Sequence, residues 1–502
     1  MSQVSDLFSQ FSKHISPAYN HDRCERSVPM RLYSMQKREF ALVVLAFLAV
    51  YFLLIVIGLS GPPITEIEHQ VGTLLDNKDN PKSLSKGPFY IRTNQLSSYH
   101  QQLWLIGKMQ VKDRDGETFQ KNFQVEVSIT GVTAANVPLS LLDSSSMHNR
   151  TRTLQCVGKN CQEINLAHLG FIEFSHYIFV VKFFCIEEYA LSQVLFFFKS
   201  YNPAFTQMEI WFRLIFLLIT GAAFVAASGS LRRFHWRDWS MEQKWILILL
   251  FLLFLFNDPQ FPLVLLWKSP FPGILDGLFQ SSFLCSLLMF WLCVYHGLRQ
   301  NNRSFKSFYL PKLILVGSLW LSAFTLAVWE RSNELRDPTY SYEVDVHHYQ
   351  GFKTYFYISC VACVLALVYF VIRAYSELQS MPYFDLRLNF VTFFMVIILL
   401  ATISMTVLRF GVGILEDHFV SDLNTTYASS SEFMCFYGLF NLYVYTMAYV
   451  YLPGDVSPAQ LANIMKDNPT ISMMNDSDEE ILFGDECRKP LNSRVSDGDD
   501  SD

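Results

Sequence analysis

Long runs of apolar residues dominate the pattern along the chain, and eight of them are long enough to cross a membrane as helices. An α-helix needs roughly 17–25 residues to span ~30 Å of hydrocarbon. The runs are Phe40–Ser60, Met208–Ser228, Trp245–Trp267, Ile274–His296, Leu313–Trp329, Thr354–Arg373, Phe390–Leu408 and Glu432–Leu452. The pattern predicts a membrane α-helical protein with eight spans, in which a single anchor helix (40–60) precedes a seven-helix bundle (208–452).

Lys and Arg gather on one side of this predicted topology. They precede the first run and fill the segments 229–244 and 297–312, whereas the segment 409–431 holds Glu416, Asp417 and Asp422. Positively charged flanks stay in the cytosol, so we expect both the N-terminal segment 1–39 and the C-terminal tail to be cytosolic. The first run lacks a cleavage site of small residues and is expected to remain as a signal anchor.

Residues 61–207 follow a different pattern, in which Val, Ile, Phe and Tyr alternate with polar residues. Such alternation is typical of strands with one buried face. The clearest strand patterns are Gln102–Val111, Asn122–Ile129, Arg152–Cys156, Tyr177–Phe184 and Gln193–Tyr201. They predict an all-β sandwich on the lumenal or extracellular side, between the first and second helices. The alternative is an irregular loop with some strand content.

Composition narrows the class of protein further. Hydrophobic residues make up 51% of the chain and charged residues only 17%, against about 25% charged residues in soluble proteins. The net charge is −6, and the acidic residues concentrate after Leu452. These values exclude nucleic-acid binding and a purely soluble enzyme. They predict a disordered, acidic cytosolic tail over residues 453–502, in which Ser477 followed by three acids is a candidate phosphorylation site.

Two glycosylation sequons agree with the predicted topology. Asn149 and Asn424 each begin an Asn-X-Thr sequon in a segment expected on the lumenal side. The sequons at Asn302 and Asn475 fall on the cytosolic side. We therefore predict glycan on Asn149 and Asn424 alone.

Signs of catalysis or of a bound metal are lacking in the sequence. The chain has no GxSxG, HExxH or P-loop motif and no Cys/His spacing typical of zinc. No cofactor and no enzymatic activity are expected. Cys156 and Cys161 lie in the predicted β-domain, close enough along the chain for a tight disulfide.

Polar residues inside the predicted membrane helices are the candidate functional residues, because burying them in lipid is costly. Asn257 and Asp258 interrupt the third run. Gln280 lies at a similar depth on the next one, and Asp276 lies one turn higher on the same face. This helical hairpin is either functional, as a ligand cavity or a proton-sensitive switch, or a satisfied polar contact that locks two helices. Asn441 lies in the middle of the last run and needs a partner on another helix.

Arg213 lies near the outer end of the second run, one turn after Glu209. A long cationic side chain in this position normally extends to the membrane surface. We therefore expect Arg213 to reach the interface and to pair locally with Glu209.

Several sequence blocks resemble the transmembrane protein 181 family, which is related to Wntless and to the GOLD-domain seven-helix group. The blocks are HNRTRTL (148–154), YNPAF and EIWFR (201–213), RDW and EQKW (237–245), NDPQFPL (257–263), FWLCVYHG (290–297), FYLPK (308–312) and KDNP (466–469). The resemblance implies a GOLD-like sandwich, a Wntless-like bundle, and roles in carrying cargo or binding ligands along the secretory and endocytic route. It also implies a role as a host factor for bacterial cytolethal distending toxin.

Two classes of function remain open on this basis. The first is a receptor or cargo-binding protein of the plasma membrane or of Golgi and endosomal membranes. It would hold a lumenal protein ligand or lipidated cargo with its β-domain and a lipid group in the bundle. The alternative is a signalling receptor similar to G-protein-coupled receptors. Tyr383 and Leu386 fit the tyrosine-x-x-hydrophobic signal that clathrin adaptors bind as an extended peptide.

Overall fold

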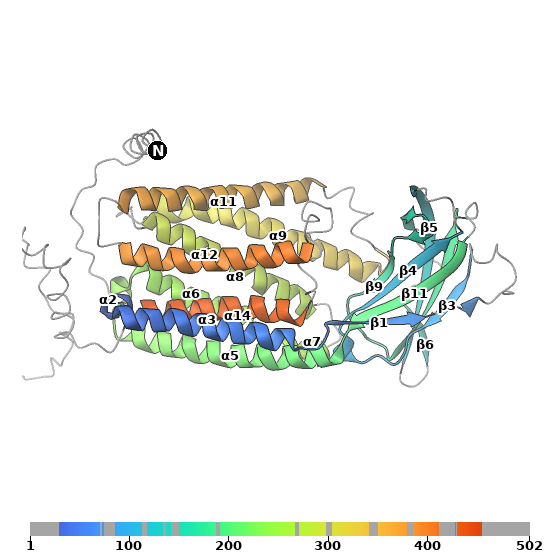
Figure 1. Ribbon diagram of the computed structural model, residues 1–502, viewed down its shortest axis with the longest axis horizontal. Coiled ribbons are helices and arrows are strands. Elements are labelled where there is room, and N and C mark those ends of the chain that lie inside the picture. Colours follow the sequence, from blue (N-terminus) through green and yellow to red (C-terminus); the bar gives the residue numbers. More distant parts are fainter. Residues whose placement is uncertain are drawn as a thin grey trace, which may run out of the picture.

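The structure is a computed structural model. It describes residues 30–70, 73–74, 86–112, 118–133, 137–141, 150–186, 191–266, 271–297, 304–340, 350–378, 385–410, 427 and 429–453. The long helices lie side by side along the long axis of the molecule, and the strands form a separate domain beyond one end of them (Figure 1). The predicted combination of a helical membrane bundle with an all-β domain is confirmed.

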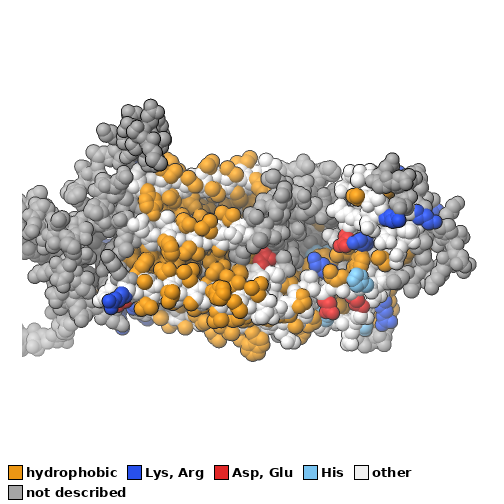
Figure 2. All heavy atoms as spheres, in the orientation of Figure 1, with side chains coloured by type: hydrophobic (Ala, Val, Ile, Leu, Met, Phe, Trp, Pro, Cys, Tyr) orange, Lys and Arg blue, Asp and Glu red, His pale blue; other side chains and the backbone are white. Residues whose placement is uncertain are grey.

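Eight long helical segments form the bundle within the described ranges. They are α3 (Lys37–Leu59), α5 (Pro203–Arg232), α6 (Met241–Phe256) continued by α7 (Phe261–Leu266), α8 (Phe271–Gly297), α9 (Leu310–Arg336), α11 (Gln350–Leu378), α12 (Asp385–Phe410) and α14 (Ser430–Tyr451). Seven of these segments are long and apolar enough to cross a membrane, and in α12 the described apolar stretch is shorter, 389–404. Hydrophobic side chains cover most of the bundle face shown in Figure 2, as expected of a surface that contacts lipid.

The second membrane helix begins earlier than its hydropathy indicates. α5 starts at Pro203, where the Asn202 side chain accepts a hydrogen bond from the Ala204 amide (2.9 Å). Asn is a favoured helix cap, and Pro fits the first helical position. The additional residues 203–207 extend α5 toward the β-domain. The last strand of the β-domain therefore leads almost directly into this helix.

Close packing between small residues holds the first helix against the last. A Cβ added to Gly58 of α3 would lie 2.6 Å from the Cα of Ser431, and one added to Gly438 of α14 would lie 2.5 Å from Leu54 Cδ1. Small residues let membrane helices approach at backbone distance and gain dispersion energy. The anchor helix α3 is therefore an integral part of the bundle.

Gly58→Val is expected to destabilise the protein by about 2 kcal/mol, because the Ser431 backbone that the new side chain meets cannot rotate away. The measurement is the thermal midpoint of the purified protein in detergent. Gly317→Val is the matched control, since a Cβ at Gly317 meets no atom within 4 Å. Equal midpoints for the two variants would contradict the close approach of α3 and α14.

The β-domain contains all five predicted strands and several shorter ones. Its longer strands are β1 (Thr65–Gln70), β4 (Leu103–Val111), β5 (Thr118–Val132), β7 (Arg150–Val157), β9 (Ile164–Leu169), β10 (His176–Phe184) and β11 (Leu191–Tyr201). The shorter strands are β2 (Thr73–Leu74), β3 (Phe89–Arg92), β6 (Pro138–Ser140) and β8 (Asn160–Cys161). The pairing order β1-β11-β4-β8-β7-β5-β10-β3-β2 is antiparallel throughout, and β9 also pairs with β4.

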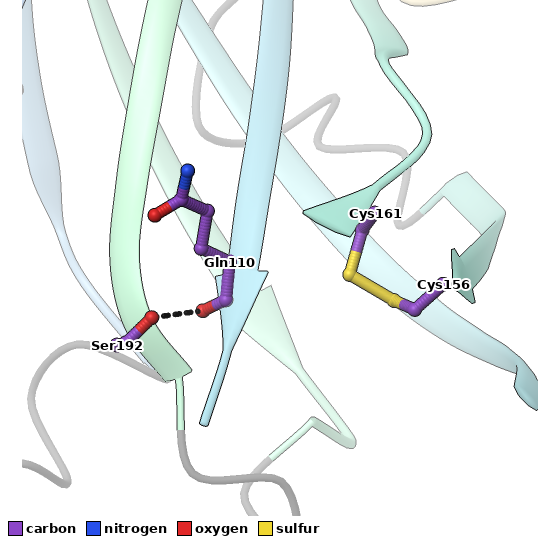
Figure 3. Close-up of a disulfide and its surroundings, with 4 residues drawn as sticks. All are labelled: Gln110, Cys156, Cys161 and Ser192. Carbon is purple, nitrogen blue, oxygen red and sulfur yellow. Dashed lines mark hydrogen bonds between the residues drawn. A yellow bond between two sulfur atoms is a disulfide. The ribbon is translucent and has the colours of Figure 1, made fainter. Parts of the chain in front are cut away.

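Aromatic side chains fill the space between the two halves of this sheet. Phe198 of β11 meets Phe179 of β10 with ring centroids 5.5 Å apart, and Phe196 meets Phe89 of β3 at 5.3 Å. These contacts join strands that do not pair, which is the arrangement of a sandwich. Cys156 and Cys161 form a disulfide across the β7–β8 turn, near the hydrogen bond from Ser192 Oγ to the Gln110 carbonyl (3.0 Å; Figure 3).

Polar contacts join the β-domain to the bundle at two places. At the first, the turn η1 (Ser98–His100) lies against α5, where the Tyr99 carbonyl accepts a hydrogen bond from Thr206 Oγ1 (2.7 Å). At the second, the segment after α9 contacts β7 and β9. Arg150 Nε donates to Asp337 Oδ2 (3.1 Å), and the His168 amide donates to the Pro338 carbonyl (2.7 Å). These two joints orient the β-domain relative to the membrane helices.

Candidate functional site: a charged cluster at a helix break

The third membrane helix is broken between α6 and α7. Pro259 has no amide hydrogen to continue the helical ladder, and Asp258 adopts the left-handed conformation (φ 52°). Asp and Asn tolerate this conformation better than most residues because their short side chains hydrogen-bond locally. Here Asp258 Oδ1 accepts from the Gln260 amide (3.3 Å). The chain therefore crosses the membrane in two helical pieces, with Asn257 and Asp258 fully buried at the break.

Asn257 belongs to a network of neutral hydrogen bonds in the bundle interior. Asn257 and Asn441 of α14 exchange amide hydrogen bonds (2.8 and 3.0 Å), and Asn257 Nδ2 also donates to Thr220 of α5 (2.9 Å). Asn441 Nδ2 donates to the Tyr437 carbonyl (2.8 Å), while Tyr445 donates to Asn441 Oδ1 (2.9 Å). Asn441 thus has the interhelical partner it required, and the hydrogen bonds of Asn257 join α6 to α5 and α14 rather than to α8, the other helix of the predicted hairpin.

Asn441→Leu is expected to lower stability by about 1–2 kcal/mol, because it leaves the amide of Asn257 without its reciprocal partner. The thermal midpoint of purified protein measures the effect. Thr446→Val on the same helix is the matched control, since Thr446 donates only to the Leu442 carbonyl of its own helix. If both variants melt at the same temperature, the reciprocal amide pair adds nothing to stability.

Asp258 belongs to a second, charged cluster. Its centre is Arg213 of α5, whose Nε and Nη2 donate to Glu209 Oε1 (3.0 and 2.8 Å). Arg213 Nη1 lies 3.5 Å from Asp258 Oδ2 and 3.6 Å from Asp276 Oδ1 of α8. The guanidinium carbon also lies 4.3 Å from the ring centroid of Phe261. One cation therefore bridges α5, the helix break and α8.

The expectation that Arg213 extends to the membrane surface is wrong. Its side chain is 6% exposed and lies inside the bundle, although the local pair with Glu209 is present. Hydropathy indicates how deep a residue lies in the membrane but not which residues of other helices it contacts. Asp258 and Asp276 could therefore not be predicted as partners of Arg213. Three carboxylates attract the guanidinium inside the bundle.

The hydrogen bonding of this cluster is incomplete, in contrast to the neutral network. Arg213 Nη1, Asp258 Oδ2 and Asp276 Oδ1 are buried, and each lacks a hydrogen bond to any described residue. The second oxygen of Asp276 accepts from Gln280 Nε2 (2.9 Å), one helical turn away. Ionisable residues buried among membrane helices are candidates for functional sites.

The charged cluster connects directly to the β-domain. Gln101, which follows the turn η1, donates from Nε2 to Thr206 Oγ1 (3.0 Å) and to Glu209 Oε2 (3.1 Å). Glu209 thus accepts from the β-domain with one oxygen and from Arg213 with the other. Sequence reasoning missed Gln101 and Glu209 as site residues, and neither has a motif that would have identified it.

The remaining candidate residues are only partly described. Asn149, Asn424, Tyr383 and Ser477 lie outside the described residues, so their predicted modifications and the adaptor signal stay predictions. Leu386 is the second residue of α12, so its backbone is helical where the adaptor signal needs an extended one. Within the described ranges, no group of three or more His, Cys, Asp or Glu residues has an arrangement that would hold a metal ion.

Comparison with known proteins agrees with both parts of the fold. The family model for the Wntless-like transmembrane domain matches residues 202–455, and the model for the GOLD domain of TMEM181 matches residues 87–201. Human transmembrane protein 181 is 43% identical over 92% of this chain and 94% of its own. The wntless homologues of chicken and rat are each 29% identical over 38% of this chain and 37% of theirs. The chain therefore belongs to the transmembrane protein 181 family, as a multi-pass membrane protein with a GOLD domain and a Wntless-like bundle.

Proposed function

We propose that this protein is a receptor or cargo-binding protein of the secretory and endocytic route. Its β-domain would face the lumen or the cell exterior and hold a protein ligand or lipidated cargo. Both termini would be cytosolic, in the plasma membrane or in Golgi and endosomal membranes. The human relative is named as a transmembrane protein, and the matching family model is that of a Wntless-like transmembrane domain.

The observation that carries the proposal is the contact between Gln101 and Glu209. A ligand that shifts the β-domain would move Gln101, and the hydrogen bond to Glu209 would transmit that shift to Arg213 and the helix break. Buried charges with incomplete pairing respond to such shifts, because small changes in distance alter large electrostatic energies at low dielectric. The bundle would then change state when the ligand binds.

A second observation favours this function over signalling through a G protein. The short helix α2 (Arg31–Ser34) lies at the bundle end opposite the β-domain (Figure 1). Met30 and Leu32 are buried there, and the Arg31 amide donates to the Leu452 carbonyl at the end of α14 (3.1 Å). An effector that binds this end of α14 would have to displace the segment.

The test uses cells that lack the protein and measures which secreted and surface proteins change in amount. Each variant is then expressed in these cells. Wild type should restore them, whereas Gln101→Glu should not, because a carboxylate at this position would repel Glu209. The matched control is Gln193→Glu at an exposed position of β11, which should restore them fully. Unchanged secretion, together with nucleotide exchange on a G protein by the purified protein, would support the signalling alternative.

The toxin-host role implied by the family resemblance remains a prediction. The same cell lines test it by their sensitivity to bacterial cytolethal distending toxin. If the toxin uses the β-domain, cells without the protein should resist it, and Gln101→Glu should restore sensitivity because docking does not require the response of the bundle.

A further inference from the structure

The charged cluster in the bundle contains more negative than positive side chains. Glu209, Asp258 and Asp276 surround Arg213, which leaves a net charge of −2 when all four are ionised. Among the described residues, Glu432, Tyr427 and Tyr437 also lie near this cluster; Glu432 is a further carboxylate, and none of the three brings a positive charge. Uncompensated charge of this size in a membrane interior costs several kcal/mol per ion.

The geometry shows where the unbalanced charge lies. Arg213 gives its two hydrogen bonds to Glu209, so Glu209 is the neutralised partner. Asp258 uses Oδ1 for the Gln260 amide, and Asp276 uses Oδ2 for Gln280. The remaining oxygens, Asp258 Oδ2 and Asp276 Oδ1, are buried without a hydrogen bond to a described residue, and both face the same Nη1.

We propose that Asp258 and Asp276 bind one small, singly charged cation, either a proton or a monovalent metal ion, through these two oxygens, beside Arg213. Two carboxylates that face one region cannot both remain ionised cheaply, and a shared positive charge removes the repulsion. One bound cation would reduce the net charge of the four side chains from −2 to −1. Within the described ranges no group of three or more His, Cys, Asp or Glu residues would hold a metal ion, so a metal would have only these two carboxylates as acidic ligands.

Occupancy of this site would change how strongly Arg213 is attracted to the helix break and to α8. Because Glu209 links Arg213 to Gln101, the cation would also affect the contact between bundle and β-domain. A proton would make this contact depend on the acidity of the compartment, and a metal ion on its salt composition. The binding of the cation itself does not depend on which ligand the β-domain holds.

The experiment measures the thermal midpoint of the purified full-length protein in lipid nanodiscs in two series. One replaces choline chloride by sodium chloride at about pH 7.5, and the other lowers the pH from about 7.5 to about 5.5 in choline chloride. A bound cation stabilises the folded state by mass action, so wild type should gain about 3–5 °C in one of them. A gain in the first identifies a metal ion, and a gain in the second identifies a proton.

Variants assign the gain to the two aspartates. The double variant Asp258→Asn, Asp276→Asn should lose it, because the amides keep the shape of the side chains and remove the excess charge. Asp238→Asn, in the turn η3 (Trp236–Asp238) at the bundle end opposite the β-domain, should keep it. If the double variant does not fold, Asp276→Asn alone should at least halve the gain. The proposal is overturned if wild type gains nothing in either series, or if the aspartate variants gain as much as wild type.

Discussion

Arg213→Leu is expected to lower the free energy of unfolding by about 3–5 kcal/mol, which is enough to prevent most of the protein from reaching the cell surface. The change removes the only positive charge among the described residues that contact Glu209, Asp258 and Asp276. Breaking a buried ion pair leaves uncompensated charge, and here three carboxylates lose their partner at once. Asp258→Leu should cost less, because Arg213 keeps Glu209 and Asp276.

Surface biotinylation and the thermal midpoint in detergent measure the effect. Arg232→Leu is the matched control, since Arg232 is exposed at the far end of the same helix. Arg213→Lys should fall between wild type and Arg213→Leu, because an ammonium keeps the charge but lacks the planar fork whose two N–H groups both donate to Glu209 Oε1. Normal surface levels of Arg213→Leu would show that the carboxylates do not depend on the guanidinium.

The main elements of the fold could be predicted from local pattern. The apolar runs predicted the membrane helices, and the alternation of apolar and polar residues predicted the strands β4, β5, β7, β10 and β11. The strand β1 was not predicted, because Thr65–Gln70 is mostly polar and shows little alternation. It lies at the edge of the sheet, where it pairs with β11. Its assignment depends on a partner more than a hundred residues away.

The candidate site could be predicted only in part, because its contacts also join residues that are far apart in the sequence. Position along a helix follows from counting residues, so Asp276 and Gln280 could be placed one turn apart on the same face of their helix, and Gln280 does contact Asp276. Which faces meet depends on helix packing. The left-handed backbone at Asp258 turns two neighbouring residues in different directions, so that Asn257 joins Asn441 while Asp258 joins Arg213. A sequence shows these residues as one polar pair.

Asp337→Asn is expected to loosen the second joint between the β-domain and the bundle by about 2 kcal/mol, or about 30-fold in the opening equilibrium. Asp337 accepts hydrogen bonds from Arg150 Nε (3.1 Å) and from the Thr339 amide (2.9 Å). Arg152 in addition donates to the Thr339 carbonyl. An amide at this position keeps an acceptor for Thr339 but loses the attraction to Arg150.

The effect should depend on pH in a defined direction. Burial alone would raise the pKa of Asp337, but the hydrogen bonds from Thr339 and Arg150 outweigh it and hold the pKa below its usual value. A lowered folded-state pKa adds stability that is complete above the unfolded value of about 3.9 and is lost as the pH falls through the folded value. The difference between wild type and Asp337→Asn should therefore be constant near neutrality and shrink below about pH 4.

Hydrogen–deuterium exchange of the segments 150–157 and 337–340 measures this opening directly, with wild type and variant compared at each pH. Glu163→Gln is the matched control, because the Lys108–Glu163 pair is exposed and such pairs add little stability. Equal exchange in wild type and Asp337→Asn at neutral pH would mean that the second joint does not depend on this carboxylate. The orientation of the β-domain would then rest on Gln101 and Thr206 at the first joint, and Gln101→Glu alone should free it.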